Sequence, residues 1–256
     1  MNIVILGGTK GMGRALARRC VEHGDRVFLL GRSEVDLQRS AVDLDLRAGL
    51  GSAPDSTPRS CVARCDLEQP EGFAAALDAA QAHFAGAAID AIVVTAGVFA
   101  TQDELESDPA RTERLLRVNF TNTVLFCEEA RKRLLAQGGG TLCVFSSVAG
   151  DRARKPVVLY GASKAGLSAY LDGIDHKFHG QGLRVLCVRP GFVKTGMTAG
   201  LKPPPFAGEP TQVARDVRRA LCGRDPRTVL YTPWIWQLVM GVIATLPRAV
   251  MRRINF

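Results

Sequence analysis

The fold follows from residues 2–13, which read NIVILGGTKGMG. The apolar run at residues 2–6 predicts a short buried strand, and a helical pattern begins after the glycines. Glycine lets backbone N–H groups approach a diphosphate at a helix N-terminus, because any Cβ would block that approach. The predicted turn has glycine at positions 7, 11 and 13, as Gly7, Gly11 and Gly13. An ordinary turn is the alternative, but the position directly after the first strand favours a dinucleotide-binding turn.

Strand and helix patterns alternate along the rest of the chain. Short apolar runs predict further strands at residues 26–30, 61–64, 89–95, 141–146, 184–189 and 229–231. Helical patterns lie at about residues 11–23, 33–48, 71–84, 111–137 and 160–180. The alternation predicts an α/β fold, a doubly wound parallel sheet of the Rossmann type with ligands at the carboxyl ends of its strands. We expect one dinucleotide-binding catalytic domain at residues 1–232, with a surface loop at 49–60, and an amphipathic, hydrophobic helical tail at 233–256.

Composition excludes several classes of protein. The chain has 256 residues, of which 46% are hydrophobic and 23% charged, so disorder, collagen-like repeats and a disulfide scaffold are excluded. The formal net charge of +8 suits an anionic cofactor, an acidic substrate or a membrane surface. No basic-aromatic tract or zinc-finger spacing occurs in the sequence, so we expect no nucleic-acid partner.

The cysteines and the start of the chain indicate the compartment. The seven cysteines are odd in number and dispersed, which favours reduced thiols in the core. Neither Cys61 with Cys65 nor His176 with His179 completes a tetrahedral ligand set, so we expect no metal site. The sequence starts with a strand-like run and has no basic signal segment. We therefore expect a cytoplasmic protein.

The end of the second predicted strand indicates which dinucleotide binds. Folds that prefer NAD place an acidic residue there, where it bonds the ribose 2′-hydroxyl. This chain has Arg32 and Ser33 instead, and Lys10 lies in the glycine turn. The two cations would attract a 2′-phosphate, so the sequence predicts NADP or NADPH as the cofactor. The alternative is that Arg32 and Lys10 are solvated surface cations.

Four polar residues form a candidate catalytic set. Tyr160 and Lys164 lie four positions apart on a predicted helix and share one face. We expect the ammonium of Lys164 to lower the pKa of Tyr160 and so to suit it to proton transfer. Ser147, at the end of the fifth predicted strand, would hold a substrate carbonyl oxygen. Asn119, on the long helix, would place a water against Lys164.

These motifs resemble those of the short-chain dehydrogenase/reductase family, over roughly residues 1–195. The matching features are the glycine turn, Asp66 in CDL, Ala96-Gly97, Asn119 in VNF, SSVAG at 146–150, YGASK at 160–164 and PGFVKT at 190–195. The resemblance implies that Asn119, Ser147, Tyr160 and Lys164 are catalytic. The sequence departs from the family at Leu6, where Thr is usual, and at Thr95, where Asn is usual. Both positions lie in supporting turns.

The resemblance also implies a set of cofactor contacts. Asp66 would contact adenine, Lys164 the nicotinamide ribose, and Val193 and Thr195 the nicotinamide carboxamide and phosphate. The full expected set is Gly7, Thr9, Lys10, Gly11, Met12, Gly13, Arg32, Ser33, Asp66, Leu67, Ala96, Gly97, Tyr160, Lys164, Pro190, Gly191, Val193 and Thr195.

The C-terminal segment is apolar and then basic. Residues 228–247 contain no charged residue, and Arg248, Arg252 and Arg253 follow. After the last predicted strand, Trp234–Leu246 is too short to span a bilayer, and paired Trp with trailing Arg favours an interfacial helix or the mouth of a lipid-substrate site. Packing on the core or on another subunit is one alternative, and a spanning helix is another. The tail, with the basic stretch 152–155, is similar to that of the reductases of the decaprenylphosphoryl-ribose 2′-epimerase system, which act on a lipid-linked keto-sugar.

Together these features predict an NADPH-dependent oxidoreductase that reduces a ketone to a secondary alcohol with Tyr160 as general acid. The tail favours an apolar or lipid-linked ketone, above all a lipid-linked keto-sugar, with residues 202–206 as a substrate lid. A long-chain keto-lipid reductase, acting for example on a 3-keto sphingoid base, is an alternative. A non-catalytic NADPH-binding scaffold or sensor is another, and the intact catalytic set argues against it. We expect a homo-oligomer with peripheral contact at the inner face of a membrane through Trp234–Leu246.

Overall fold

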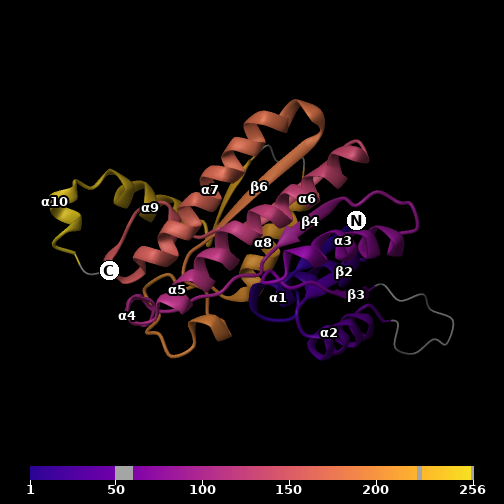
Figure 1. Ribbon diagram of the computed structural model, residues 1–256, viewed down its shortest axis with the longest axis horizontal. Coiled ribbons are helices and arrows are strands. Elements are labelled where there is room, and N and C mark those ends of the chain that lie inside the picture. The colour runs from indigo at the N-terminus through magenta and orange to yellow at the C-terminus, as the bar shows by residue number, and fades with distance from the viewer. Residues whose placement is uncertain (50–59, 224–226, 255–256) are drawn as a thin grey trace.

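The computed structural model describes residues 1–49, 60–223 and 227–254. These residues form one seven-stranded parallel sheet with the strand order β3-β2-β1-β4-β5-β6-β7 (Figure 1). The strands are β1 (Asn2–Leu6), β2 (Arg26–Gly31), β3 (Ser60–Arg64), β4 (Ala91–Val94), β5 (Gly140–Phe145), β6 (Leu183–Pro190) and β7 (Val229–Thr232). Every predicted strand is present, and the doubly wound fold is confirmed. The predicted loop at 49–60 lies almost entirely outside the described residues.

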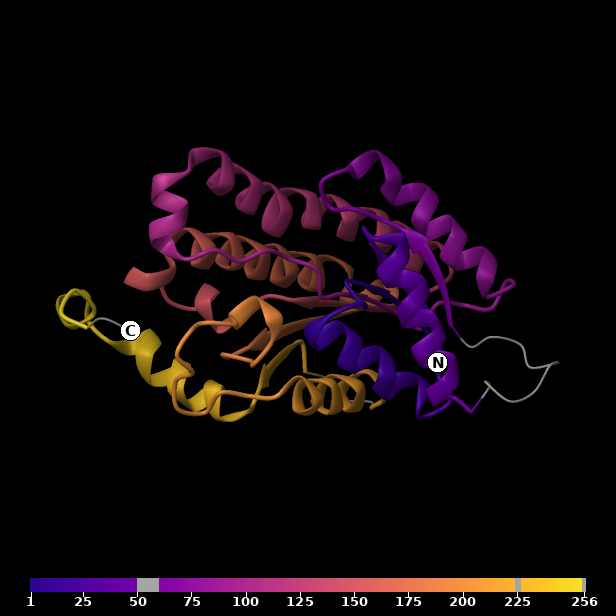
Figure 2. The same cartoon turned by 90° about the horizontal axis from the view of Figure 1, so that it is seen from below.

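Helices cover both faces of the sheet (Figure 2). They are α1 (Gly11–Val21), α2 (Glu34–Arg47), α3 (Phe73–His83), α4 (Gln102–Ser107), α5 (Pro109–Leu116), α6 (Asn122–Ala136), α7 (Val158–Phe178), α8 (Pro210–Cys222), α9 (Ile235–Thr245) and α10 (Arg248–Met251). Side chains alternate along each strand, so Val4 of β1 packs with α3, α6 and α7 on one face, and Ile5 packs with α1, α2 and α8 on the other. Two apolar layers result.

The predicted long helix at 111–137 is interrupted. It consists of α5, a π-helical turn at Arg117–Thr121 and α6. A π-helical turn inserts one extra residue into a helix and often marks a functional site. Here it contains Asn119, one of the four candidate catalytic residues.

The strand order places the functional end of the sheet. β1 pairs with β2 on one side and with β4 on the other, so the connection from β1 to β2 and the connection from β4 to β5 run in opposite directions across the sheet. In open α/β sheets a crevice forms at such a reversal, and ligands bind there. The glycine turn that follows β1 lies at this point.

Most of the cysteines lie in the core. Cys20, Cys65, Cys127, Cys143 and Cys187 are buried free thiols, Cys61 is half-buried and Cys222 is exposed. Within the described ranges no cluster of His, Cys, Asp and Glu is suited to a metal ion. None of the described helices has the length and apolar character needed to cross a bilayer.

Candidate active site

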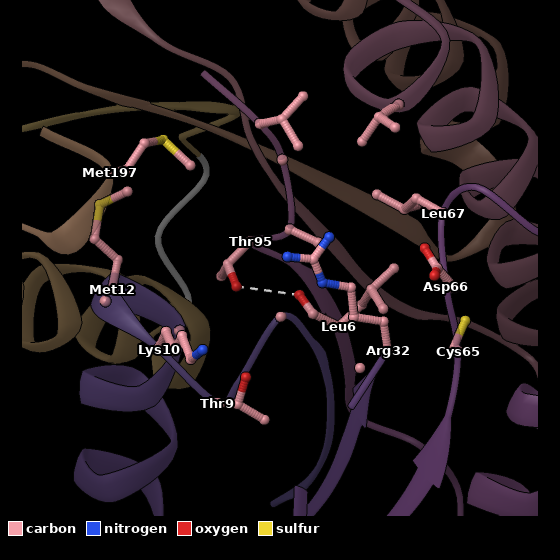
Figure 3. Close-up of a pocket in the computed structure, with 18 of the residues that line it drawn as sticks. Leu6, Thr9, Lys10, Met12, Arg32, Cys65, Asp66, Leu67, Thr95 and Met197 are labelled. Atoms are coloured by element: carbon pink, nitrogen blue, oxygen red, sulfur yellow. Dashed lines mark hydrogen bonds between the residues drawn. The ribbon is translucent and has the colours of Figure 1, made fainter. Parts of the chain in front are cut away.

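A cavity of about 330 Å³ lies at the carboxyl ends of β1, β2 and β4 (Figure 3). Twelve of the predicted cofactor residues line it: Gly7, Thr9, Lys10, Gly11, Met12, Gly13, Arg32, Asp66, Leu67, Ala96, Gly97 and Thr195. Sequence analysis missed other lining residues, among them Gly31, Cys65, Glu68, Val98 and Met197. Several of these are neighbours of predicted residues, so their position next to a motif was the available signal.

The glycine turn has the close backbone packing that a diphosphate cradle requires. A Cβ added to Gly13 would lie 2.3 Å from the carbonyl oxygen of Gly7 and 2.4 Å from Oγ1 of Thr95. Gly7 has φ +93° and Gly11 has φ +52°, and L side chains disfavour both conformations. The turn also lies at the N-terminus of α1, which favours an anion. The cavity and turn therefore fit a dinucleotide.

Thr95, one of the two departures from the family, contacts the backbone of Leu6. Oγ1 of Thr95 donates a hydrogen bond to the carbonyl oxygen of Leu6 (3.1 Å), and the N–H of Ala96 donates to the same oxygen (3.1 Å) (Figure 3). Thr95 thus joins the ends of β1 and β4 directly beneath the glycine turn.

The basic residues at the far end of the cavity differ from the prediction in one respect. Arg32 is exposed at the cavity rim and has no ion-pair partner within the described part of the chain. Lys10, expected to reach the same 2′-phosphate, forms an ion pair with Asp36 instead (3.0 Å). Ser33 does not line the cavity; its Oγ accepts a hydrogen bond from the N–H of Asp36 and so caps α2. Both cations line the cavity, and Arg32 is the one without an ion-pair partner among the described residues.

The candidate catalytic side chains adjoin the cavity wall. A Cβ added to Gly97 would lie 3.7 Å from Nζ of Lys164. Tyr160 lies in the first turn of α7, hydrogen-bonded to the side chain of Ser147 and packed edge-on against Phe99 at 5.2 Å between ring centroids. The Oγ of Ser147 accepts a hydrogen bond from the N–H of Ala149 (3.1 Å). The structure thus brings the predicted serine, tyrosine and lysine together.

The lowered pKa expected for Tyr160 is not found in this structure. Burial raises the pKa of Tyr160 to about 12, and the hydrogen bond with Ser147 only partly opposes it. Nζ of Lys164 lies 5.9 Å from the centroid of the Tyr160 ring and donates a hydrogen bond to the carbonyl oxygen of Phe145 (3.0 Å). Burial also lowers the pKa of Lys164 to about 8. Desolvation disfavours the charged forms of both groups.

Asn119 is bonded to the loop that follows β4. It is completely buried, and its side chain exchanges two hydrogen bonds of 2.8 Å with the backbone N–H and carbonyl of Val98. Each of its two polar atoms thus has one partner in this loop, and its predicted role in placing a water against Lys164 stays a prediction. The side chain fixes the cavity loop that contains Val98.

The predicted cofactor residues after β6 are held by a residue that sequence analysis did not assign to the site. A Cβ on Gly191 would lie 2.0 Å from Nε1 of Trp236, so the indole rests against the Gly191 backbone. Nε1 donates to the carbonyl oxygen of Phe206 (3.2 Å), and Val148 belongs to the same apolar cluster. Pro190 and Val193 are buried and do not line the cavity. No sequence signal indicates these contacts, because Trp236 and Gly191 are far apart in the chain.

The buried lysine predicts a pH-dependent stability. Between pH 8 and 10.5 the unfolded chain keeps the Lys164 proton and the folded chain loses it. The contribution of Lys164 to the free energy of unfolding therefore rises with pH across this window, by about 3 kcal/mol. Urea unfolding is measured for the wild type and for Lys164→Met at several pH values. The free energy of unfolding of the wild type should increase relative to that of the variant as pH rises.

The exposed Lys177, near the end of the same helix, provides the control variant Lys177→Met. Taking differences between variants removes the opposing effect of the buried thiols, whose pKa values burial raises. Parallel stability curves for the wild type and Lys164→Met would contradict the prediction.

Comparison with known proteins assigns the family. The family model for short chain dehydrogenase matches residues 1–205. An uncharacterized oxidoreductase in the mprA 5′ region of Streptomyces coelicolor is 34% identical over 99% of this chain and 95% of its own length. The structure of a short chain dehydrogenase from Burkholderia cenocepacia in complex with NADP aligns with a TM-score of 0.79 at 22% identity, covering 98% of this chain and 96% of that one. An actinorhodin polyketide ketoreductase with NADPH aligns with a TM-score of 0.77 at 20% identity, covering 90% of this chain and 95% of that one.

The chain therefore belongs to the short-chain dehydrogenase family and is an oxidoreductase enzyme. This confirms the family that the motifs indicated.

Proposed function

We propose that this enzyme is an NADPH-dependent reductase that converts a ketone into a secondary alcohol. The observation that carries the proposal is the row of groups beside the cavity wall. Lys164 lies behind Gly97, Tyr160 lies one helical turn from Lys164, and Ser147 is hydrogen-bonded to Tyr160. The cavity that fits a dinucleotide thus directly adjoins side chains suited to carbonyl chemistry. Two structural neighbours are described with NADP or NADPH, and one of them is a ketoreductase.

The side chains divide the chemistry between them. A bound reduced nicotinamide would supply the hydride. The hydroxyls of Ser147 and Tyr160 lie close enough together for one substrate carbonyl oxygen to accept hydrogen bonds from both. The raised pKa of Tyr160 keeps its phenol protonated at neutral pH, which is the form that donates a proton to the oxygen as the alcohol forms. The nearby ammonium of Lys164 then stabilises the phenolate.

Arg32 is proposed to select the phosphorylated cofactor. Its guanidinium is unpaired among the described residues and lies at the cavity rim, where it can form charge-assisted hydrogen bonds with a 2′-phosphate. Arg32→Asp should therefore shift preference from NADPH toward NADH, with about 10- to 100-fold weaker NADPH binding. Dissociation constants for both cofactors test this result.

Arg39→Asp supplies the control, because Arg39 is exposed on α2 and does not line the cavity. It makes the same change of charge seven residues farther along the chain. If both variants weaken NADPH binding equally, the effect is one of net charge, and Arg32 does not recognise the phosphate.

The proposed substrate is apolar or lipid-linked, with a lipid-linked keto-sugar favoured. The wall beside Ser147 is apolar, because Val148 packs with Phe192, Trp236 and Met240. The expected lid residues 202–206 lie in a segment whose base is closed by hydrogen bonds between Lys194 and Gly208 and between Gly208 and Phe192. A long-chain keto-lipid fits the same wall. Peripheral contact with the inner face of a membrane, through Trp234–Leu246, belongs to this proposal.

Turnover of NADPH in host extracts tests the proposed function. Purified enzyme is offered a membrane-lipid extract and a soluble-metabolite extract separately, with Tyr160→Phe as the blank. We expect NADPH consumption with the lipid extract. Turnover with soluble metabolites alone would contradict the lipid substrate and indicate a general carbonyl reductase. Tight NADPH binding without turnover in either extract would contradict the reductase and favour an NADPH-binding sensor.

A further inference from the structure

Helix α9 has two apolar faces, and only one of them is packed. Trp236 and Met240 are 7% and 2% exposed and face the body of the enzyme, where they contact Val148 and Phe192. On the opposite face, Trp234, Leu238 and Val242 are 66%, 58% and 64% exposed. These three follow at intervals of four residues, so they form one stripe along the helix. We call these three residues the outer stripe.

The outer stripe is held outward by contacts at both ends of the helix. The indole of Trp236 rests on Gly191 and donates to the carbonyl oxygen of Phe206. At the other end, Nη2 of Arg152 donates to the carbonyl oxygen of Leu246 (2.7 Å). These anchors prevent the helix from rolling to bury its outer stripe on the body.

The charged residues that follow the outer stripe in the sequence all have one sign. The sequence contains no Asp or Glu after Asp225, whereas Arg248, Arg252 and Arg253 follow the helix and are exposed. Figures 1 and 2 show α9 and α10 projecting beyond the body formed by the sheet and its covering helices. An exposed apolar stripe with tryptophan and adjacent arginines matches the chemistry of an anionic bilayer surface.

We propose that the outer stripe and the three arginines dock the enzyme on an anionic lipid bilayer, with α9 lying in the plane of the interface. Negatively charged headgroups form ion pairs with the arginines, and the outer stripe inserts at the boundary between the headgroups and the acyl chains. A second copy of the chain fits this surface less well, because a two-fold contact would bring the arginines together without acidic partners. This inference rests on the proposed function in one respect: docking would give the enzyme access to a lipid-linked ketone.

The lid lies next to the docked helix. The backbone of Phe206 is bonded to Trp236, and its side chain is 59% exposed. Docking through α9 therefore brings the lid close to the bilayer. An apolar substrate can then pass from the membrane to Ser147 and Tyr160 without crossing water.

Vesicle co-sedimentation of the full-length enzyme tests the docking. Vesicles of phosphatidylcholine alone are compared with vesicles of phosphatidylcholine mixed with phosphatidylglycerol, and the tryptophan emission of the wild type is recorded in parallel. We expect binding to the anionic vesicles, with a blue shift from Trp234. The double variant Trp234→Ser/Leu238→Ser should lose at least about tenfold in binding. Arg252→Gln/Arg253→Gln should lose about fivefold for each arginine, and only with anionic vesicles.

A matched control comes from α2, where Val42 and Leu46 are 60% and 62% exposed on an unrelated surface. Val42→Ser/Leu46→Ser should bind vesicles like the wild type. Equal losses in both double variants, or no binding by the wild type, would overturn the proposal. So would a wild-type dimer that Leu238→Ser converts to monomers, because the stripe would then be a subunit interface.

Activity distinguishes this inference from the proposed function. Trp234→Ser/Leu238→Ser should retain NADPH consumption with a ketone dissolved in detergent micelles and lose it with the same ketone in anionic vesicles. If the wild type binds vesicles and reduces no ketone in either form, the proposed function fails and the docking surface stands.

Discussion

Tyr160→Phe is expected to reduce turnover by about 10²–10⁴-fold and to leave NADPH affinity nearly unchanged. The phenol is the proton donor beside Ser147, and its removal takes away one hydroxyl from a half-buried ring that still packs against Phe99. The cofactor cradle is formed by other residues. Single-turnover rates with saturating NADPH, together with a direct titration of NADPH, measure the two quantities separately.

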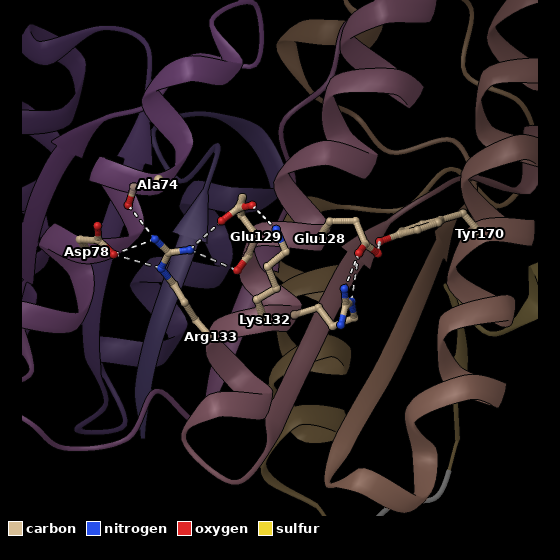
Figure 4. A network of polar contacts seen from close by, with 8 residues as sticks. Ala74, Asp78, Glu128, Glu129, Lys132, Arg133 and Tyr170 are labelled. Carbon is tan, nitrogen blue, oxygen red and sulfur yellow. Dashed lines mark hydrogen bonds and ion pairs between the residues drawn. The ribbon is translucent and has the colours of Figure 1, made fainter.

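Tyr170→Phe is the matched control for this substitution. Tyr170 lies on the same helix and donates a hydrogen bond to Oε1 of Glu128 (2.7 Å), in a polar network between α6 and α7 that lies away from the cavity (Figure 4). The same atom is lost, but turnover should stay at the wild-type level. Combined loss of turnover and NADPH binding in Tyr160→Phe would argue against a role confined to proton transfer.

Gly13→Ala is expected to weaken NADPH binding by about 10- to 100-fold. The new Cβ would lie 2.3 Å from the carbonyl oxygen of Gly7, and this contact involves backbone that cannot rotate away. Relief requires the turn to move, which changes the spacing of the N–H groups that form the cradle. NADPH titration measures the loss, and thermal unfolding shows how far the fold itself is affected.

Gly173→Ala makes the same change where space is available. An added Cβ at Gly173 in α7 meets nothing within 4 Å, so this variant should bind NADPH normally and gain up to about 1 kcal/mol of stability. Wild-type NADPH binding by Gly13→Ala would show that the turn adapts to a side chain, and the cradle argument would be wrong.

Local patterns in the sequence were sufficient for the fold and for most of the cavity. The period of apolar residues and the glycine turn after β1 depend on neighbours in the chain, so the strands and the dinucleotide cradle were predictable. Tyr160 and Lys164 share a helix face for the same reason, and Ser147 follows directly from the end of β5.

Other features depend on residues that are distant in the chain. The ion pair between Lys10 and Asp36 depends on how the glycine turn and α2 are placed relative to each other. The hydrogen bonds of Asn119 with Val98 required the loop after β4 to meet the π-helical turn. Neither pairing has a local signature.

The sequence by itself therefore determined the strands of a doubly wound sheet, the position of the cradle and the identity of the serine, tyrosine and lysine. Only the tertiary structure decided how these groups ionise and which face of the tail is exposed. Burial sets the pKa of Tyr160 and of Lys164, and packing on Gly191 turns Trp236 inward while Trp234 faces outward. Both outcomes depend on the solvent exposure of each group, which is determined only when distant elements pack together.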